Sequence, residues 1–456
     1  MTWEVSGPAD FREEVRSRLR QVPAAPALQA QAQAWLEALE GAFREAGTEP
    51  GAGVGAAAGH AAVRDRALAA LAQWPVPHRR LERWKYTPIG ALLEQRFTLA
   101  PQPLPVDRAV ACPAWSGYRV VIVNGRWVPA WSRLPEGVVV EMGASDGWDQ
   151  QDWMGAVLTR YAQEGMVLRV EAGVALDAPI LVESVVHGVQ VACFPSHRME
   201  LGAGAQATVV EWSHSTPETT GFCGTGWTLS LGEGAVASLQ QVVNDAGTVH
   251  RQVYLTANQA AESRMQHVHF VVQASQVRAD LAFRLLGEGA HTELKGAYLP
   301  CGSEKVAHYT TVDHRVPHCT SDEDYRGVLY DQATGVFNGK IFVRTDAQKT
   351  EAYQRNANLL VGREAVMYSK PELEIYADDV KCSHGCTVGQ IDEKALFYAR
   401  SRGISEDAAR ALLVEAFVAE ALEVLPGEGV RDAVRSALAA RHGGFGLEDE
   451  WNDWTA

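Results

Sequence analysis

The sequence is short of basic residues and of cysteine. Its 456 residues include 41 Lys and Arg against 56 Asp and Glu, which gives a formal net charge of −15. This balance argues against a surface that neutralises nucleic acid phosphates or binds an anionic membrane. An odd number of cysteines, scattered along the chain, is not a disulfide framework and indicates a reducing compartment. They are Cys112, Cys193, Cys223, Cys301, Cys319, Cys382 and Cys386.

Long hydrophobic runs are also missing. No stretch approaches the roughly 20 uncharged apolar residues that a transmembrane helix requires. The first residues include Glu4, Asp10 and Arg12 and lack the apolar segment of a signal peptide. We therefore expect a cytoplasmic protein. With 46% hydrophobic and 21% charged residues, the chain has a globular composition and the length of two or three domains.

Three common motifs of nucleotide binding and hydrolysis do not occur. The nearest approach to a phosphate-binding loop, Gly335–Ile341, is one residue too short and has Ile where Ser or Thr would contact magnesium. No G-x-G-x-x-G run opens a helix after a strand, and the G-x-S-x-G elbow of hydrolases is absent. The sequence thus gives no support to an ATPase, a dinucleotide-binding enzyme or an elbow-type hydrolase.

Helical periodicity is confined to the two ends of the chain. Residues 9–46 carry apolar residues at helical spacing and predict a helix or a pair of helices, and Ala61–Gln73 predicts another. Residues 47–60, rich in Gly and Ala, predict a flexible linker. The chain is thus expected to comprise an N-terminal helical region, a β-rich core and a C-terminal helical region, over residues 1–100, 111–388 and 389–456.

A repeated unit runs through the central span. Leu201–Ala207 matches Leu231–Ala237, and both match Leu286–Ala290, at offsets of 30 and 55 residues. A degenerate copy at Leu255–Ala260 divides the longer interval. Units of roughly 25 to 30 residues, each a glycine turn followed by short β-type runs, predict the coils of a β-solenoid. The alternative is an antiparallel sandwich, whose hairpins also need glycine turns.

Helical periodicity returns in the last part of the chain. A helix is expected over Ile391–Arg402, and Ser405 is expected to cap the helix that follows. That second helix has a wide apolar arc and is broken at Pro426. A shorter helix is predicted over Val430–Arg441, and residues 447–456 are expected to be a frayed tail.

Soft metal ligands concentrate in Lys381–Cys386. Cys382, His384 and Cys386 alternate there with other residues, so that an extended strand would project all three from one face. Zinc and iron–sulfur centres prefer such thiolate and imidazole ligands. A fourth ligand is lacking, which argues against a self-contained zinc site. Two interpretations stay open: small buried cysteines beside a hydrogen-bonded histidine, and half of a metal site that another subunit completes.

A second group of potential ligands precedes Thr320–Tyr325. Its spacing matches no standard zinc pattern, so hydrogen bonds in turns or at an interface are favoured over a metal or acid–base site. The group comprises His308, Asp313, His314, His318 and Cys319. His267 and His269 alternate like residues on one face of a strand and are expected to be structural.

Several ordered motifs resemble the SufB/SufD family of iron–sulfur cluster assembly proteins. They are Ser321–Val328, Gly339–Ile341, Gln354–Leu360, Pro371–Ile375, Asp379–Gly385, Phe397–Tyr398 and Ser401–Ile404. Val380–Gly385 and the N-terminal segment Arg83–Pro88 are similar to the SufD branch. The resemblance is dense over about residues 300–425, weaker across the repeats and thin before residue 75.

This resemblance implies a right-handed parallel β-helix between two helical regions, in agreement with the repeat. It also implies a non-catalytic scaffold that forms a heterodimer with SufB and docks the SufC ATPase on its C-terminal helical region. The family's interface cysteine and histidine correspond to Cys382 and His384, which would hold a transient iron–sulfur cluster completed by SufB. Cys386 departs from the family, where a small residue is common. The apolar residues expected to meet the ATPase are Ile404, Leu413, Phe417, Val418 and Leu422.

No cofactor is expected to stay bound to the chain alone. The resemblance also implies a flavin in the assembled complex, for which the sequence has no motif, and the isolated chain is a candidate homodimer. Two other functions compete. A β-helix enzyme acting on carbohydrates would need a groove of carboxylates, and Asp322, Glu323 and Asp324 form the dense acidic run. An autonomous metal-binding protein would carry iron or zinc when purified alone.

Overall fold

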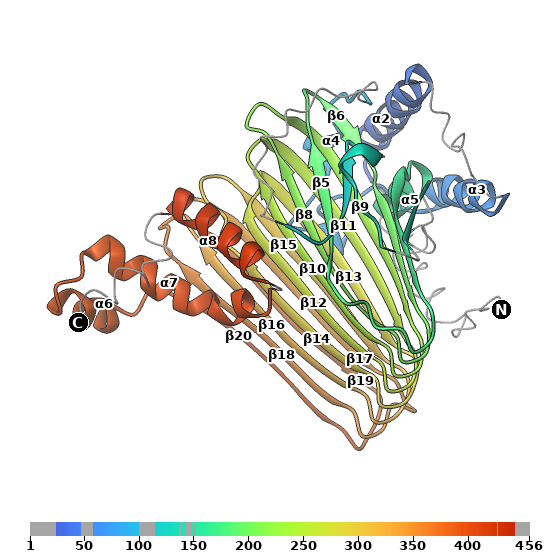
Figure 1. The fold of residues 1–456 in the computed structure, drawn as a ribbon. Coiled ribbons are helices and arrows are strands. Elements are labelled where there is room, and N and C mark those ends of the chain that lie inside the picture. The colour runs from blue at the N-terminus through green and yellow to red at the C-terminus, as the bar shows by residue number, and fades with distance from the viewer. Residues whose placement is uncertain are drawn as a thin grey trace.

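A computed structural model gives the fold of most of the chain. It describes residues 24–46, 58–99, 115–135, 138–142, 148, 152–425 and 427–442. The predicted linker lies outside the described residues except at positions 58–60, which are helical, and the predicted tail over 447–456 lies outside them entirely. The central span forms a parallel β-solenoid of about eight turns between residues 167 and 389, with helices at both ends (Figure 1). This confirms the solenoid and excludes the sandwich.

Each coil of the β-helix contributes one strand to each of two sheets. Sheet 1 has the order β2 (Arg126–Trp127), β1 (Tyr118–Val123), β5 (Ile180–Val186), β8 (Gln206–Ser215), β10 (Val236–Asp245), β12 (Arg264–Gln273), β14 (His291–Tyr298), β16 (Thr320–Leu329), β18 (Glu351–Leu360) and β20 (Lys381–Gly389). Sheet 2 has the order β19 (Val366–Ile375), β17 (Thr334–Val343), β15 (Lys305–His314), β13 (Gln276–Leu285), β11 (Thr248–Gln259), β9 (Thr220–Leu231), β7 (Ser196–Leu201), β4 (Glu164–Val170) and β3 (Val138–Met142), and β6 (Val191–Cys193) pairs with β9 off this path.

Glycines of the predicted repeat shape one corner in several of the coils. Gly204, Gly234 and Gly289 have φ of 66°, 63° and 73° in the turns that lead from sheet 2 to sheet 1. Glycine adopts this left-handed conformation without the Cβ clash that other residues suffer. The amide of Gly204 donates to the carbonyl of Glu233, and that of Gly234 to Ala261, so that each corner is bonded to the next coil.

The degenerate repeat lies four residues later than predicted. The register of β9 and β11 places Gln259 opposite Leu231, so that Glu262, with φ of 55°, occupies the position of the corner glycine. The copy is therefore Gln259–Ser263, and the prediction of Leu255–Ala260 was wrong. The apolar start of that segment suggested a match, but it belongs to the body of β11 and fills the space between the sheets.

A small residue follows each left-handed corner position and packs inside the coil. The stacking of coils at strand spacing leaves no room there for a large side chain. The column is fully buried and consists of Ala205, Ala235, Ser263, Ala290, Cys319 and Thr350. Cys319 is therefore explained by packing.

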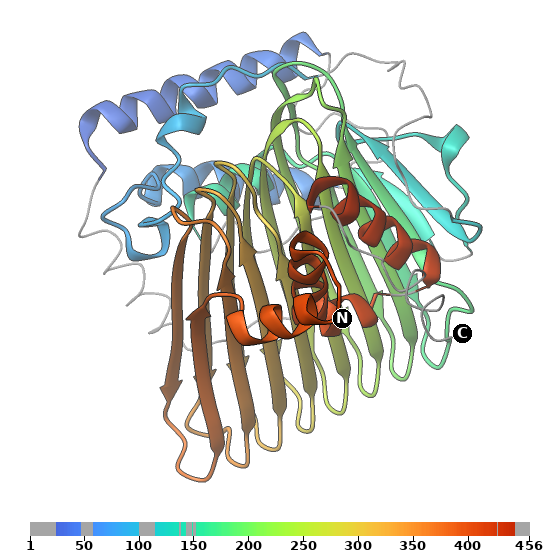
Figure 2. The ribbon, with the colours of Figure 1, turned by 90° about the vertical axis from the view of Figure 1, so that its left-hand side faces the viewer.

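The helices at the two ends cover opposite outer faces of the β-helix (Figures 1 and 2). On the N-terminal side, the helices pack on the outer faces of β9 and β11 through residues such as Trp35, Phe222 and Tyr254. These helices are α2 (Pro26–Glu45), α3 (Ala58–Gln73), α4 (Gly90–Leu93) and α5 (Trp153–Arg160), with a 3₁₀ turn at Glu82–Trp84. No helix in the described ranges is both long and apolar enough to cross a membrane.

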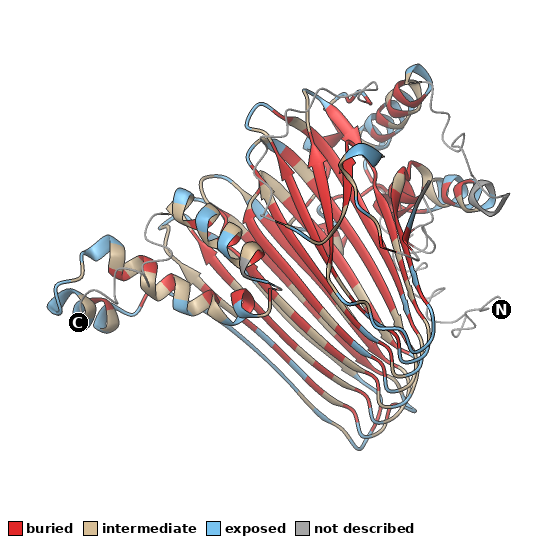
Figure 3. Ribbon diagram, viewed as in Figure 1, coloured by how far each residue is buried: buried red, intermediate tan, exposed pale blue. Residues whose placement is uncertain are grey.

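The C-terminal helices are α6 (Glu393–Ser401), α7 (Glu406–Glu423) and α8 (Glu428–His442). The hydroxyl of Ser405 accepts a hydrogen bond from the amide of Ala408 at 3.3 Å, which confirms the predicted cap. Helices α7 and α8 pack on the outer face of sheet 1. Both faces of the early strands are thus covered, whereas burial declines toward β19 and β20 (Figure 3).

Candidate functional site

The C-terminal end of the β-helix is open. Strand β19 ends sheet 2 and β20 ends sheet 1, and each has one neighbouring strand, β17 and β18. No later coil in the described part of the chain covers them. Nearly every residue of β20 is exposed, whereas every second residue of β18 from Ala352 to Asn358 is buried (Figure 3). An unpaired strand edge and an uncovered lumen therefore meet at this end.

The three predicted ligands lie in a row on β20. Their register partners on β18 are the buried residues Ala352, Gln354 and Asn356. Register partners in parallel strands point to the same side of the sheet, so Cys382, His384 and Cys386 face the open lumen. Cys382 is half-buried against the main core, whereas His384 and Cys386 are exposed. The interpretation of Cys386 as a buried small residue is thereby wrong.

This row does not form a closed metal centre. Positions two residues apart on a strand are separated by about 6.6 Å, whereas a tetrahedral zinc ion holds its donor atoms within about 4 Å of one another. Among the described residues, no group of three or more His, Cys, Asp and Glu side chains is arranged to hold a metal ion. Burial also raises the pKa of Cys382, so binding of a metal there releases a proton.

A polar column continues into the lumen beneath His384. Gln354 donates a hydrogen bond from Nε2 to Oε2 of Glu323 on β16. Burial raises the pKa of Glu323 to about 7. The other side-chain oxygen of each residue is buried without a hydrogen-bond partner. Glu323 therefore exchanges its proton near neutral pH, two coils below β20.

The acidic run around Glu323 does not form a groove of carboxylates. Successive residues of β16 point to opposite faces, so Glu323 enters the lumen while Asp322 and Asp324 lie outside. Asp322 accepts a hydrogen bond from Arg355 at 3.2 Å, and Asp324 accepts one from Arg326 at 2.9 Å. The acidic run that favoured a carbohydrate-active enzyme is thus divided between the inner and outer faces of sheet 1.

The histidines of the lumen are structural, as predicted for His267 and His269. Both are fully buried, and His269 Nδ1 lies 2.7 Å from Nε2 of His308. Burial lowers the pKa of all three, that of His269 to about 3, so they are neutral at pH 7. His308 therefore belongs to the core of the β-helix.

The rest of the second group is dispersed. Buried His314 lies 2.9 Å from the hydroxyl of Ser321, and Asp313 accepts hydrogen bonds from Arg315 and Arg344 at 2.8 Å. His318 is an exposed corner residue with φ of 60°. Hydrogen bonding in strands and turns, the interpretation favoured above, accounts for the group.

The apolar residues of the C-terminal helices divide into two sets. Val418 and Leu422 are buried against sheet 1, while Ile404, Leu413 and Phe417 are half-buried. The most exposed aromatic residues, Phe397 and Tyr398 of α6, are 73% and 60% exposed; they form one of the motifs of the resemblance but were not among the residues expected to meet the ATPase. An open groove of about 480 Å³ lies beside them and is lined by Phe397, Arg400, Ser401, Gly403, Ile404, Ser405 and Glu406.

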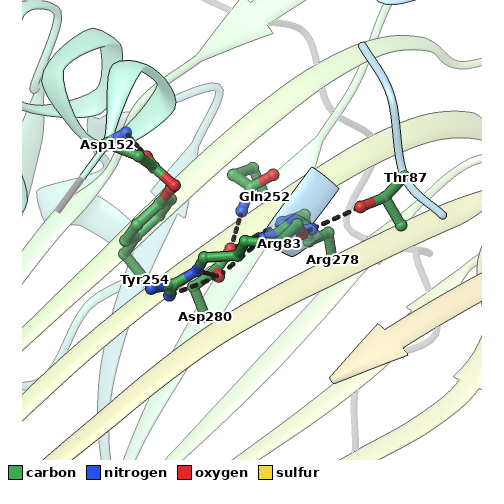
Figure 4. A network of polar contacts seen from close by, with 8 residues as sticks. Arg83, Thr87, Asp152, Gln252, Tyr254, Arg278 and Asp280 are labelled. Atoms are coloured by element: carbon green, nitrogen blue, oxygen red, sulfur yellow. Dashed lines mark hydrogen bonds and ion pairs between the residues drawn. The ribbon is translucent and has the colours of Figure 1, made fainter. Parts of the chain in front are cut away.

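The Arg83–Pro88 segment anchors the N-terminal region to sheet 2 (Figure 4). Asp280 of β13 accepts hydrogen bonds from Arg83 at 2.8 Å, from Arg278 at 2.8 Å and from Gln252 at 2.8 Å. The Arg278 guanidinium also donates to the backbone carbonyl of Arg83 at 2.8 Å. This motif of the resemblance therefore has a structural role, since it bridges two parts of the fold.

Aromatic contacts extend this anchor along the β-helix. The guanidinium of Arg278 lies between the rings of Trp84 and Tyr309, 3.7 Å from each centroid. Farther along, Tyr86 stacks on Tyr368 of β19 with centroids 4.1 Å apart. The N-terminal segment thus contacts sheet 2 from β13 to the last coil.

Comparisons with known proteins identify relatives of this chain. Residues 184–417 match the family model described as SUF system FeS cluster assembly, SufBD core domain, and residues 55–145 match the SufBD protein N-terminal region. The iron–sulfur cluster assembly protein SufD of Escherichia coli (strain K12) is 31% identical over 387 residues, covering 82% of this chain and 91% of the relative.

Two further relatives extend the comparison. A SufBD family protein of Synechocystis is 27% identical and covers 83% of this chain and 90% of the relative. The iron–sulfur cluster assembly protein SufD of Bacillus subtilis (strain 168) is 28% identical over 47% of this chain and 48% of the relative. The chain therefore belongs to the SufBD family of SUF iron–sulfur cluster assembly proteins and is SufD-like.

Proposed function

We propose that this chain is a non-catalytic scaffold subunit that pairs with a SufB-like subunit at its open end and binds a SufC-like ATPase through its C-terminal helices. The observation that carries the proposal is the ligand strand β20, which presents Cys382 and His384 at an unpaired sheet edge. Iron–sulfur clusters are held by cysteine thiolates, and histidine replaces cysteine at some of them. A nascent cluster is the cargo of this site, and the partner supplies its remaining ligands.

The surface around β20 supports pairing with another β-helix. Unpaired strand edges accept a further strand, and exposed apolar patches are typical of protein interfaces. The large apolar residues exposed on the last coil and its neighbour are Tyr353, Val366, Tyr368, Ile375, Tyr376 and Val388. Val388→Lys, at the end of β20, should therefore abolish co-purification with the SufB-like subunit. Its matched control is Val174→Lys, an exposed valine before β5.

The cluster half-site is tested in the assembled complex. His384→Ala should lower the iron and acid-labile sulfide bound per reconstituted complex several-fold, while size-exclusion chromatography shows an intact complex, because an exposed side chain contributes little to the fold. Cys382→Ser should act in the same way. Cys386→Ser, on the same face, is the matched control and should retain most of the cluster. Normal cluster content with His384→Ala would refute the half-site.

The exposed aromatic residues of α6 support docking of the ATPase. Phe397 and Ile404 line the open groove, and exposed Tyr398 follows Phe397 on α6. Half-buried Leu413 and Phe417 lie farther along the chain, on α7. Val418 and Leu422 fix this platform to sheet 1 from within. Phe397→Ser should weaken ATPase binding in a pull-down at least tenfold and leave SufB pairing intact. Val189→Ser, which removes a similarly exposed apolar side chain far from α6, should change neither.

A further inference from the structure

Two buried cysteines lie side by side near the opposite end of the β-helix from the ligand strand. Cys193 of β6 and Cys223 of β9 are register partners in parallel strands, and both are at most 1% exposed. They pack with Val186 and Val249 in a small apolar cluster. The proposed scaffold function makes no use of this pair. Of the other cysteines, Cys112 lies outside the described residues.

A buried cation lies beside one of the two thiols. Arg251, the register partner of Cys223 on β11, donates from Nη1 to its Sγ at 3.4 Å. Asp245 holds this guanidinium through two hydrogen bonds, of 2.5 and 2.9 Å. The arginine is thereby fixed in position with one N–H directed at the sulfur.

The two thiols differ in acidity. The neighbouring Cys193 thiol and the charge of Arg251 lower the pKa of Cys223 against the opposing effect of burial. The neighbouring Cys223 and burial raise the pKa of Cys193 well above its ordinary value. The pair therefore has the division of roles seen in reactive dithiols, one sulfur as the thiolate and the other as its proton donor.

We propose that Cys193 and Cys223 form a redox-modification site that closes to a disulfide when a hydroperoxide oxidises it. The Cys223 thiolate attacks one peroxide oxygen, the O–O bond breaks, and a sulfenic acid forms as hydroxide leaves. The Cys193 sulfur, losing its proton to that hydroxide, then attacks the sulfenic sulfur and displaces a second hydroxide, which is protonated to water. Two thiols and one hydrogen peroxide thus give one disulfide and two waters.

The strand geometry admits this bond. Neighbouring parallel strands lie about 4.8 Å apart, within the Cα separation of about 4.4 to 6.8 Å that disulfides span. Strand β6 has three residues, and besides its ladder with β9 it makes a single β-bridge, between Val191 and Thr98. Such a short strand opens locally at a lower free energy than the long strands of the core, which gives a small peroxide its access. Oxidation is therefore expected to be slower than at exposed Cys386.

The test uses the full-length wild-type chain. It is treated with hydrogen peroxide, alkylated under denaturing conditions, cut with trypsin and analysed by mass spectrometry. Trypsin cleaves after Arg198, between the two cysteines, so the disulfide appears as a linked pair of peptides that a reductant separates. The internal control is Cys319, a buried thiol without a neighbouring thiol or cation, whose pKa burial raises to about 11. It should remain alkylated throughout.

Two variants assign the roles of the sulfurs. In Cys193→Ser, the sulfenic acid on Cys223 cannot be resolved and should be trapped by dimedone. In Cys223→Ser, Cys193 should give at least tenfold less adduct. Recovery of both cysteines as free thiols would overturn the proposal if exposure to peroxide is continued well beyond the time that oxidises all of Cys386 and circular dichroism shows the chain to be folded. Equal yields of dimedone adduct on Cys223 in Cys193→Ser and on Cys193 in Cys223→Ser would overturn the role of Arg251.

Discussion

Replacement of Glu323 by Gln tests the buried carboxyl beneath the ligand strand. Glu323 is 1% exposed, and its pKa is about 7 in the folded chain, against about 4.3 in an unfolded one. Between these two values only the folded state holds the proton. The free energy of unfolding therefore falls as the pH rises from about 4.3 to 7, and the loss is complete above that interval.

The magnitude follows from the pKa shift. One pKa unit corresponds to 1.36 kcal/mol, so ionisation of Glu323 costs the folded chain roughly 2 to 3 kcal/mol between pH 5 and 8. Glutamine has nearly the same shape and does not ionise. The variant should therefore gain about this amount over the wild-type chain when the comparison is moved from pH 5 to pH 8.

Urea denaturation of both chains at pH 5, 6, 7 and 8 measures the difference. Burial lowers the pKa of His267, His269 and His308, so these side chains take up protons on unfolding below about pH 6.5. This destabilises both chains equally and cancels in the difference between their free energies of unfolding. Glu293→Gln is the matched control. Burial opposes its ionisation, but hydrogen bonds from Gln266 and Lys295 lower its pKa, so its difference should be flat over this range. A flat difference for Glu323→Gln would refute the reasoning.

Two further predictions concern the N-terminal anchor and the corner turns. Asp280→Ala leaves the guanidinium of Arg278 buried without its carboxylate and should lower the free energy of unfolding, measured in urea titrations, by about 3 to 5 kcal/mol. The control is Asp379→Ala, which removes the exposed partner of Lys349 and should lower the free energy of unfolding by less than about 1 kcal/mol. Glu262→Gly relieves a left-handed non-glycine residue and should raise the free energy of unfolding by up to about 1 kcal/mol. Glu233→Gly, outside that conformation, should lower the free energy of unfolding, and equal effects of the two substitutions would contradict the corner assignment.

The repeat allowed the solenoid to be predicted because a corner glycine recurs in several coils. Where the corner residue is Glu262, the signal disappears, and apolar Leu255, four positions before Gln259, gave a false match. The cap at Ser405 was predictable because its effect is local. Local patterns therefore sufficed for features that depend on neighbouring residues.

Features that depend on stacking between coils could not be predicted. Cys193 and Cys223 are 30 positions apart in the sequence and become neighbours because one coil brings the chain back beside itself. No short sequence motif contains both cysteines. The exposure of Phe397 depends on where α6 leaves the β-helix and not on its own periodicity. For the ligand strand, alternation predicted a shared face, but only the fold identifies that face as the uncovered lumen.

The contacts of the N-terminal segment make the two strands of the last coil unequal in stiffness. Through Tyr86 on Tyr368, and through the ion pair of Glu82 with Lys370, β19 is tied to a part of the chain that is itself anchored at Asp280. Strand β20 has no such tether among the described residues and is held by β18. The compliance of the open end is thus concentrated in the strand that carries Cys382 and His384, while the coil behind it keeps its shape.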